Sequence, residues 1–237
     1  MIIRRINIPF DNQMSRTQVV LGWIYLAVHM VILPLLLSLY AAFSPNPVTD
    51  TQSNLVYFGI GALFVLCVML PYLRRSFDLL LDRLRLCLLT ILIAMMINYA
   101  LSTFVAIFLM LGESLAENPN NSAIMELAED NSGVIRGLAI FIGPVIEEVL
   151  YRGVAFGSIR RRSRGWAYVV SAALFALSHV WQYALAYQDA GLLLYALQYI
   201  PVTLALTWAY ERSGSIWTSI FFHMGYNALS FYVLSML

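Results

Sequence analysis

Two adjacent carboxylates and an arginine interrupt one of the most apolar stretches of the chain. Glu147 and Glu148 stand together and Arg152 follows, inside a run that is otherwise apolar from Gly137 to Phe156. An apolar run of about 20 residues is typical of a helix that spans a membrane. Charged side chains at membrane depth are costly, so they are usually paired or functional. The stretch therefore predicts a functional site inside a membrane helix.

The spacing of the three charges separates the roles of the two acids. Glu148 and Arg152 are four residues apart with the acid first, which is the favourable order for an ion pair on a helix. Glu147 points about 100° away on the same helix, so Arg152 cannot neutralise both acids equally well. A buried carboxylate without a cationic partner is an effective base near neutral pH. We therefore expect Glu147 to act as the base, with Glu148 as the alternative. A purely structural ion pair between Glu148 and Arg152 is compatible with this role.

Two further segments carry groups that could join the acids. His179 ends the segment that begins at Phe175, and His223 and Asn227 are four residues apart on one helical face. At about 1.5 Å per helical residue, Glu147 and His179 lie about 20 Å, and His223 about 16 Å, from the expected cytoplasmic ends of their helices. Three separate segments thus bring polar groups to a similar depth.

A carboxylate, two histidines and an amide suit the hydrolysis of an acyl bond by water. The carboxylate can deprotonate the water, and one histidine can pass a proton to the leaving amine. The second histidine and the amide can donate hydrogen bonds to the oxyanion. A covalent mechanism is less favoured because no serine or cysteine is paired with a base at helical spacing, although Ser178 adjoins His179.

The composition predicts an integral membrane protein of the all-α class. Of 237 residues, 61% are hydrophobic and 11% are charged, whereas soluble domains carry about 25% charged residues. A formal net charge of +1 offers no basic surface for nucleic acid. Cys67 and Cys87 show no metal-binding or redox spacing and are expected to be small core residues.

Apolar runs predict a polytopic helical bundle of about seven spans, with eight as the alternative. Pro201 is expected to kink the sixth span, and the long polar connection 112–136 to hold a short surface helix around 122–128. Residues 1–133 would form N-terminal helices without a motif, and residues 134–237 a catalytic core. The predicted spans are Val19–Phe43, Leu55–Leu73, Leu86–Leu111, Gly137–Ile159, Trp166–Trp181, Gly191–Tyr210 and Ser215–Leu237.

The distribution of basic residues predicts the orientation of the bundle. All 14 basic residues are arginines, and twelve of them lie at the N-terminus or in alternate loops of the predicted topology. Basic loops stay in the cytoplasm. We therefore expect a cytoplasmic N-terminus and an external C-terminus, in the inner or plasma membrane if the protein is bacterial. The catalytic groups are expected nearer the cytoplasmic half of the membrane.

Three motifs resemble those of a known family. The heptapeptide from Glu147 to Gly153 resembles the EExxxRG motif of the CAAX protease and bacteriocin-processing family, often called the CPBP or Abi family. Phe175–His179 is similar to its FxxxH motif, and His223–Asn227 is similar to its HxxxN motif. The motifs occur in the order of the family, each in a predicted span. The resemblance covers roughly Val134–Ser230.

The family consists of intramembrane glutamate-type endopeptidases. Its eukaryotic members remove the last three residues of prenylated CAAX proteins, and its bacterial members are linked to peptide maturation, bacteriocin immunity and secretion. The resemblance implies that Glu147 and His179 activate water and that His223 and Asn227 form the oxyanion hole. A peptide or a membrane-protein segment would be the substrate. Three neighbours would support the site: Glu148, Arg152 and Phe175.

Two other classes of function remain open. Two glutamates and two histidines could bind zinc in a metalloprotease, but the HExxH spacing is absent and Asn227 would be a poor ligand. We therefore expect no cofactor. A transporter or an immunity protein that acts by binding would not be an enzyme. A transporter should show repeated halves, which the sequence lacks, and a protein that only binds would tolerate loss of Glu147. His29 has no partner in the sequence pattern and is expected to be structural.

Overall fold

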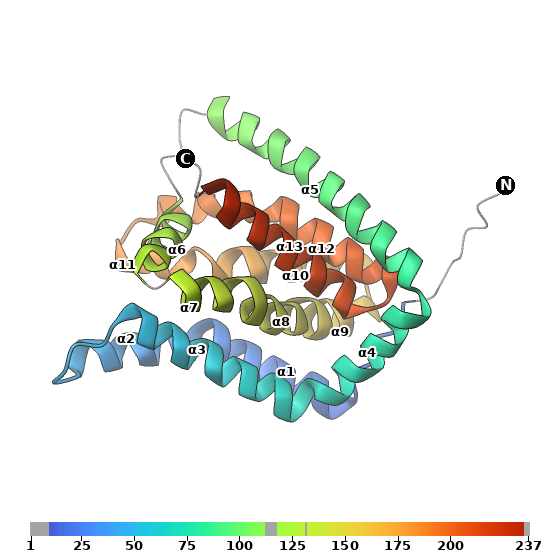
Figure 1. The fold of residues 1–237 in the computed structure, drawn as a ribbon, viewed down its shortest axis with the longest axis horizontal. Helices are drawn as coiled ribbons and strands as arrows, with labels where there is room; N and C mark the ends of the chain where they lie inside the picture. Colours follow the sequence, from blue (N-terminus) through green and yellow to red (C-terminus); the bar gives the residue numbers. More distant parts are fainter. Residues whose placement is uncertain (1–9, 112–117, 131, 235–237) are drawn as a thin grey trace.

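The computed structural model describes residues 10–111, 118–130 and 132–234. Within these ranges every regular element is a helix, which confirms the predicted all-α class. The helices form one bundle (Figure 1), and short segments with wider or tighter turns carry the label η. Arg4 and Arg5 of the predicted cytoplasmic N-terminus lie outside the described residues, as does the end of the predicted seventh span.

The first helical rod consists of α1 (Arg16–Ala27), η1 (Val28–Ile32) and α2 (Leu33–Phe43). It begins with a capping box, in which the Ser15 hydroxyl accepts from the Gln18 amide and the Gln18 side chain accepts from the Ser15 amide. Such a pair satisfies two backbone donors that have no partner inside the helix. The rod therefore starts slightly earlier than the apolar run alone predicts.

A second rod runs beside the first and consists of α3 (Asp50–Phe64), η2 (Val65–Met69) and α4 (Leu70–Asp82) (Figure 1). Thr49 and Gln52 form a capping box at its start. The box fixes the end of the loop between the two rods. The rod extends beyond the predicted second span at both ends.

The next helix, α5 (Leu84–Leu111), lies along the outer side of the bundle (Figure 1). Cys87 on this helix is buried as expected, whereas Cys67 on η2 is exposed, contrary to expectation. Many apolar side chains of α5 are exposed, which is typical of a surface that faces lipid. Exposed members on α5 include Leu88, Leu89, Leu92, Met96 and Phe104.

Four helices of the described ranges are long and apolar enough to cross a membrane. They coincide with the predicted first, second, third and sixth spans, so the chain has the features of an integral membrane protein. The other predicted spans are shorter or more polar, and for them the crossing stays a prediction. The four helices are Arg16–Phe43, Asp50–Asp82, Leu84–Leu109 and Ala190–Ser213.

The helix that carries the acidic pair lies in the middle of the bundle (Figure 1). After the surface helix α6 (Pro119–Asp130), which agrees with the helix predicted around 122–128, α7 (Ser132–Gly137) leads into η3 (Leu138–Ile142) and α8 (Gly143–Glu147). Two further segments of helix then follow without a break in the described chain. The acids therefore stand in the interior of a long composite helix.

The composite helix continues through η4 (Glu148–Phe156) and α9 (Gly157–Arg160). Every residue of η4 is buried, and the segment packs against α1 and the C-terminal helices. The turns of η4 are wider than those of an α-helix. Widened turns are rare and frequently occur at functional sites.

The next helix, α10 (Arg164–Ser178), is capped at its N-terminus by Ser163, whose side chain accepts a hydrogen bond from the Trp166 backbone amide. His179 is its C-terminal cap, and the short helix α11 (Trp181–Ala186) follows. The predicted fifth span, 166–181, therefore contains a helix end. This break sets the ring of His179 at a helix terminus rather than in the middle of a span.

Three elements complete the bundle: η5 (Ala190–Tyr199), α12 (Ile200–Ser213) and α13 (Ile216–Leu234). Pro201 lies in the first turn of α12, where its missing N–H breaks no helical hydrogen bond. It lies at the junction of η5 and α12, and the predicted kink of the sixth span stays a prediction. Gly214 ends α12 in the left-handed conformation with φ of 78°, which glycine adopts without strain.

Candidate active site

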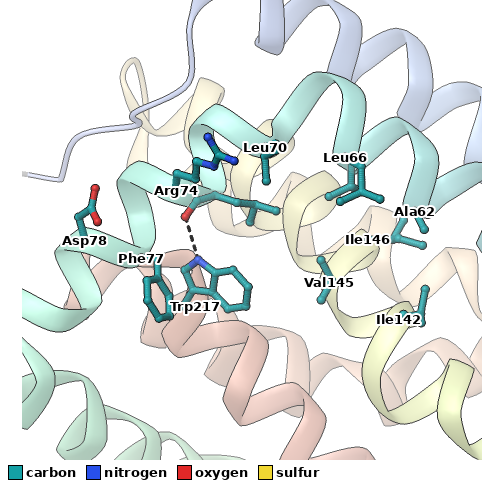
Figure 2. Close-up of a pocket in the computed structure, with 12 residues that line it drawn as sticks. Ala62, Leu66, Leu70, Arg74, Phe77, Asp78, Ile142, Val145, Ile146 and Trp217 are labelled. Carbon is teal, nitrogen blue, oxygen red and sulfur yellow. Dashed lines mark hydrogen bonds between the residues drawn. The ribbon is translucent and has the colours of Figure 1, made fainter.

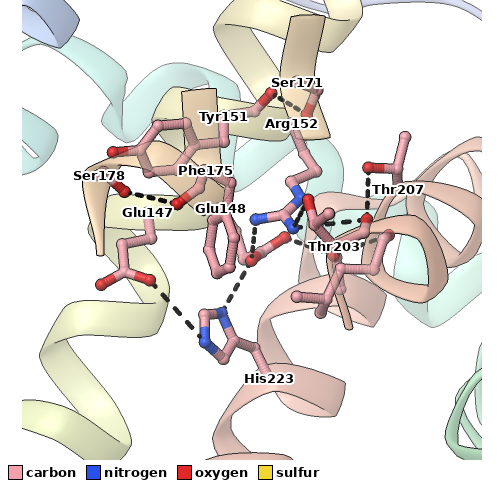
Figure 3. Close-up of polar contacts among 12 residues, drawn as sticks. Glu147, Glu148, Tyr151, Arg152, Ser171, Phe175, Ser178, Thr203, Thr207 and His223 are labelled. Carbon is pink, nitrogen blue, oxygen red and sulfur yellow. Dashed lines mark hydrogen bonds and ion pairs between the residues drawn. The ribbon is translucent and has the colours of Figure 1, made fainter. Parts of the chain in front are cut away.

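Glu148 is the centre of a buried polar network (Figure 3). Arg152 Nη1 donates to Glu148 Oε1 at 2.8 Å, and both side chains are 0% exposed. Ser219 donates its hydroxyl proton to Oε2 of the same carboxylate, and His223 Nδ1 lies 2.8 Å from Oε1. The predicted ion pair is thus present, and α13 supplies two further partners of the acid. Burial of this charge is tolerated because its oxygens are hydrogen-bonded.

Arg152 is held from two other sides. Its Nη2 donates to the Thr203 hydroxyl on α12 at 2.7 Å. The guanidinium carbon lies 4.2 Å from the centre of the Phe175 ring, an arrangement that attracts the cation to the aromatic face. The ring of Phe175 also lies 5.8 Å from that of His223, centre to centre. Phe175 therefore packs between the ion pair and a site histidine, as a packing residue or pocket wall would.

Glu147 stands outside this network. Its side chain is 20% exposed, and its Oε2 lies 3.8 Å from His223 Nε2, beyond hydrogen-bond distance (Figure 3). Because neighbouring helical positions point in different directions, Glu148 points into the packed network and Glu147 points toward a pocket. One acid is therefore neutralised by a fixed cation, and the other remains available to a ligand.

Hydrogen bonding determines which nitrogen of His223 carries a proton. An ionised carboxylate only accepts hydrogen bonds, so the contact with Glu148 requires a hydrogen on Nδ1. In the neutral ring Nε2 is then an acceptor, and only the imidazolium presents an N–H there. His223 can therefore donate to an oxyanion from Nε2 when it is doubly protonated.

His179 is oriented by its own helix end. Its Nδ1 lies 2.8 Å from the carbonyl oxygen of Phe175, which can only accept, so Nδ1 carries the hydrogen and Nε2 is the acceptor. The ring stacks on that of Tyr199, with 4.4 Å between the ring centres. These two contacts fix the ring and leave its basic nitrogen for water or substrate.

Asn227 lies one helical turn after His223. Its Nδ2 donates to the carbonyl oxygen of Ala139 at 2.8 Å. An amide nitrogen has two hydrogens, so one donor remains for a ligand. Ser219, His223 and Asn227 follow one another at intervals of four residues, and therefore line one face of α13.

One pocket of about 530 Å³ brings together the four residues that the sequence predicts as catalytic. Its walls are mostly apolar and include Phe58, Ile124, Met125, Val202 and Leu229. Glu148 and Arg152 lie behind it, in the packed interior. The members of the predicted set in the pocket are Glu147, His179, His223 and Asn227.

A second pocket of about 510 Å³ also reaches Glu147. It shares Glu147 and His179 with the first pocket, and its lining is more polar. Polar members of its lining include Asp50, Ser53, Asn54, Gln182 and Tyr183. The acid and the histidine therefore stand where an apolar and a polar pocket meet.

The largest of these three pockets, about 660 Å³, is elsewhere (Figure 2). It lies between the second rod and α8, and its lining is apolar apart from Arg74 and Asp78. Trp217 closes one side, with its indole N–H donated to the Leu73 carbonyl oxygen at 2.9 Å. None of the predicted site residues lines this pocket, so it has no part in the candidate chemistry.

The motif glycine, Gly153, has a packing role. A Cβ atom at this position would lie 2.6 Å from Met14 Cε and 3.2 Å from Tyr72 Oη. The Gly153 carbonyl oxygen accepts from Asn12 Nδ2 at 3.2 Å. The missing side chain therefore lets the segment before α1 pack directly on the helix of the acidic pair.

Sequence reasoning missed several residues of the site. Thr203 and Ser219 hydrogen-bond the ion pair, and Tyr199 stacks on His179. The interval of four between Ser219 and His223 was a usable signal. Nothing in the spacing of Thr203 or Tyr199 indicates their contacts, because these depend on how α12 and η5 pack.

The histidine outside the motifs has a partner in the structure. His29 Nε2 lies 2.9 Å from the Tyr57 hydroxyl, and the two rings stack with 4.4 Å between their centres. In the described ranges, no group of three or more His, Cys, Asp or Glu side chains is arranged to hold a metal ion.

Comparisons with known proteins bear on residues 131–229, which match the family model described as type II CAAX prenyl endopeptidase Rce1-like. The UPF0177 protein YxdF of Lactococcus lactis subsp. lactis (strain IL1403) is 31% identical over 86 residues. The aligned part covers 36% of this chain and 42% of that relative, so the chain spans less than half of its length. No solved structure matches the chain. The matched region contains all three motifs.

Proposed function

We propose that this chain belongs to the CAAX protease family and is an intramembrane endopeptidase that hydrolyses a peptide bond with water activated by Glu147 and His179. The observation that carries the proposal is the shared pocket, in which Glu147, the acid that Arg152 does not neutralise, faces two oriented histidines and an amide. Hydrolysis of an acyl bond needs a base, a proton donor and an oxyanion site. The four side chains can supply all three.

Glu147 would act as the general base. It takes a proton from a water molecule, whose oxygen then attacks the carbonyl carbon of the scissile bond. His179 would orient this water by accepting a hydrogen bond at Nε2, because Nδ1 is already bonded to Phe175. The protonated Glu147 then delivers its proton to the leaving nitrogen as the C–N bond breaks. The products are a carboxylic acid and an amine.

His223 and Asn227 would stabilise the oxyanion of the tetrahedral intermediate. The free amide hydrogen of Asn227 is one donor, and the Nε2 hydrogen of the doubly protonated His223 is the other. Preorganised donors of this kind are commonly the largest single contribution to such catalysis. Glu148 would support the imidazolium through Nδ1, and Arg152 would keep Glu148 ionised and in place.

The proposed setting is a multi-pass membrane protein with a cytoplasmic N-terminus, in the inner or plasma membrane if the source is bacterial. The apolar pocket would take a side chain of a peptide or of a membrane-protein segment. Apolar walls with a few convergent polar groups are the usual features of such a site. The surrounding lipid bilayer covers the exposed apolar helix faces.

The proposal is tested with purified protein and a peptide library. Wild type and Glu147→Gln are compared, with Glu126→Gln on the exposed surface of α6 as the matched control. Glutamine keeps the shape of the side chain but cannot accept the proton, so the rate should fall about 10²–10⁴-fold while folding is preserved. Wild-type cleavage by Glu147→Gln would refute the assignment. If Glu148→Gln were then inactive but folded, the two acids would exchange roles.

A further inference from the structure

The bundle has two ends with different charge. Four arginine-bearing segments lie at one end of the bundle, here called the arginine face: α4, α9, the start of α10 and the end of α12 (Figure 1). Glu211 near the end of α12 pairs with Arg160 on α9 and with Arg164 at the start of α10, which ties three of these segments together. Arg136 on α7 lies toward the other end. The described members of the arginine face on these segments are Arg74, Arg75, Arg160, Arg161, Arg162, Arg164 and Arg212.

The protein is closed between the active site and the arginine face. All of η4, from Glu148 to Phe156, is buried, and so is Gly157. Phe156 packs edge-on against Phe10, with 5.4 Å between the ring centres, and the Tyr72 hydroxyl donates to the Tyr210 hydroxyl at 3.0 Å. In the described part of the chain, buried and closely packed side chains therefore lie between the acids and this end.

The protein is open toward the opposite end. The polar pocket of about 510 Å³ extends from Glu147 and His179 to Asp50, at the first turn of α3, and to Gln182 on α11. In Figure 1 these elements lie at the end of the bundle away from α4 and α9. Asn120 on α6 lines the same pocket. Its polar lining can hold water, which the reaction consumes.

The depth of the acid agrees with this direction of access. Glu147 lies thirteen residues before Arg160 along the composite helix, which corresponds to about 20 Å. The hydrocarbon core of a bilayer is about 30 Å thick. The acid therefore lies beyond the midplane as seen from the arginine face.

We propose that the active site receives water and substrate from the membrane face opposite the arginine face. Because arginine-rich loops remain in the cytoplasm, that face is the outer one. The substrate is then a peptide segment that reaches the outer side, either translocated or anchored in the membrane. This conclusion about cleavage rests on the proposed function, and the route of access does not. It reverses the expectation that the catalytic groups lie nearer the cytoplasmic half.

Side-specific thiol labelling tests the route without any need for activity. Cys67→Ser and Cys87→Ala remove the only two cysteines of the chain, and single cysteines are introduced as Ser53→Cys and Gln182→Cys in the polar pocket. Arg162→Cys on the arginine face is the matched control. Intact cells are treated with a membrane-impermeant maleimide, and the protein is then purified. Labelling after permeabilisation and after denaturation shows that each thiol is present and reactive.

The pocket cysteines should react about equally in intact and permeabilised cells, whereas the control should react only after permeabilisation. Pocket cysteines that require permeabilisation, or that react only after denaturation, would overturn the proposal. A control that reacts in intact cells would overturn it as well. If the pocket cysteines are labelled from outside but the purified wild-type protein cleaves no peptide, the route of access is supported and the proposed function is refuted.

Discussion

Nδ1 of His223 lies 2.8 Å from Oε1 of Glu148, and this contact connects the last helix of the site to the buried ion pair. The second ring nitrogen lies on the side of Glu147. The ring therefore stands between an acid that is fixed by Arg152 and an acid that faces a pocket. Its orientation depends on the ion pair, although the ion pair itself touches no substrate in the proposed mechanism.

Removal of Arg152 should destabilise the fold. Arg152→Leu leaves Glu148 buried without its cation, and breaking a buried pair in this way typically costs about 3–5 kcal/mol. Thermal unfolding in detergent, followed by circular dichroism, should show a lowered transition temperature, and turnover should fall. Arg160→Leu is the matched control, since its pair with Glu211 is partly exposed and such pairs are worth about 0–1 kcal/mol. An Arg152→Leu protein with normal stability and turnover would exclude both roles for the arginine.

Loss of Asn227 should affect the chemical step. Asn227→Ala removes one oxyanion donor, which typically lowers kcat about 10²–10³-fold. KM should change little, because the donor acts mainly on the intermediate. Steady-state kinetics with a cleaved library peptide measure both constants. Asn121→Ala is the matched control, because Asn121 lines the same pocket without belonging to the catalytic set. A change confined to KM would instead indicate a residue that binds substrate.

Chelators should leave the activity unchanged. The proposed mechanism activates water with Glu147 and His179 and uses an amide that would be a poor zinc ligand. Peptide cleavage is measured before and after treatment with a strong chelator, and metal content is measured on the same samples. Stoichiometric zinc, together with activity that the chelator removes and zinc restores, would favour the metalloprotease alternative.

Enlargement of Gly153 should reduce stability without changing a catalytic group. In Gly153→Val the new side chain meets Met14 and Tyr72, and overpacking of a dense core typically costs about 1–3 kcal/mol. Gly133→Val is the matched control, since a Cβ there has nothing within 4 Å. The two thermal unfolding curves are compared in the same detergent. Equal transition temperatures would mean that the segment before α1 can move away at little cost.

The helical class and the motif residues could be predicted from the sequence for a simple reason. Apolar runs and four-residue spacings are local features, and both follow directly from helix geometry. The separate environments of Glu147 and Glu148 follow from the same geometry, since adjacent positions point in different directions. The ion pair with Arg152 is likewise a contact within one helix.

Other features depend on packing between distant segments and could not be predicted in this way. Thr203 meets Arg152 only because α12 lies against η4. The end of α10 at His179 was missed because the apolar run continues through Val180 and Trp181. The opening of the polar pocket was missed for the same reason, since α3, α6 and α11 are far apart in the chain.

The network around Glu148 also has a consequence for biosynthesis. Ser219, His223 and Asn227 all lie on α13, which follows every other element of the site in chain order. A nascent chain that has not yet inserted α13 holds Glu147 and His179 but lacks the proposed oxyanion donors and two partners of Glu148. In the proposed mechanism the site is therefore completed only by its final helix. Until that helix docks, the proposed mechanism would give no cleavage of neighbouring membrane segments.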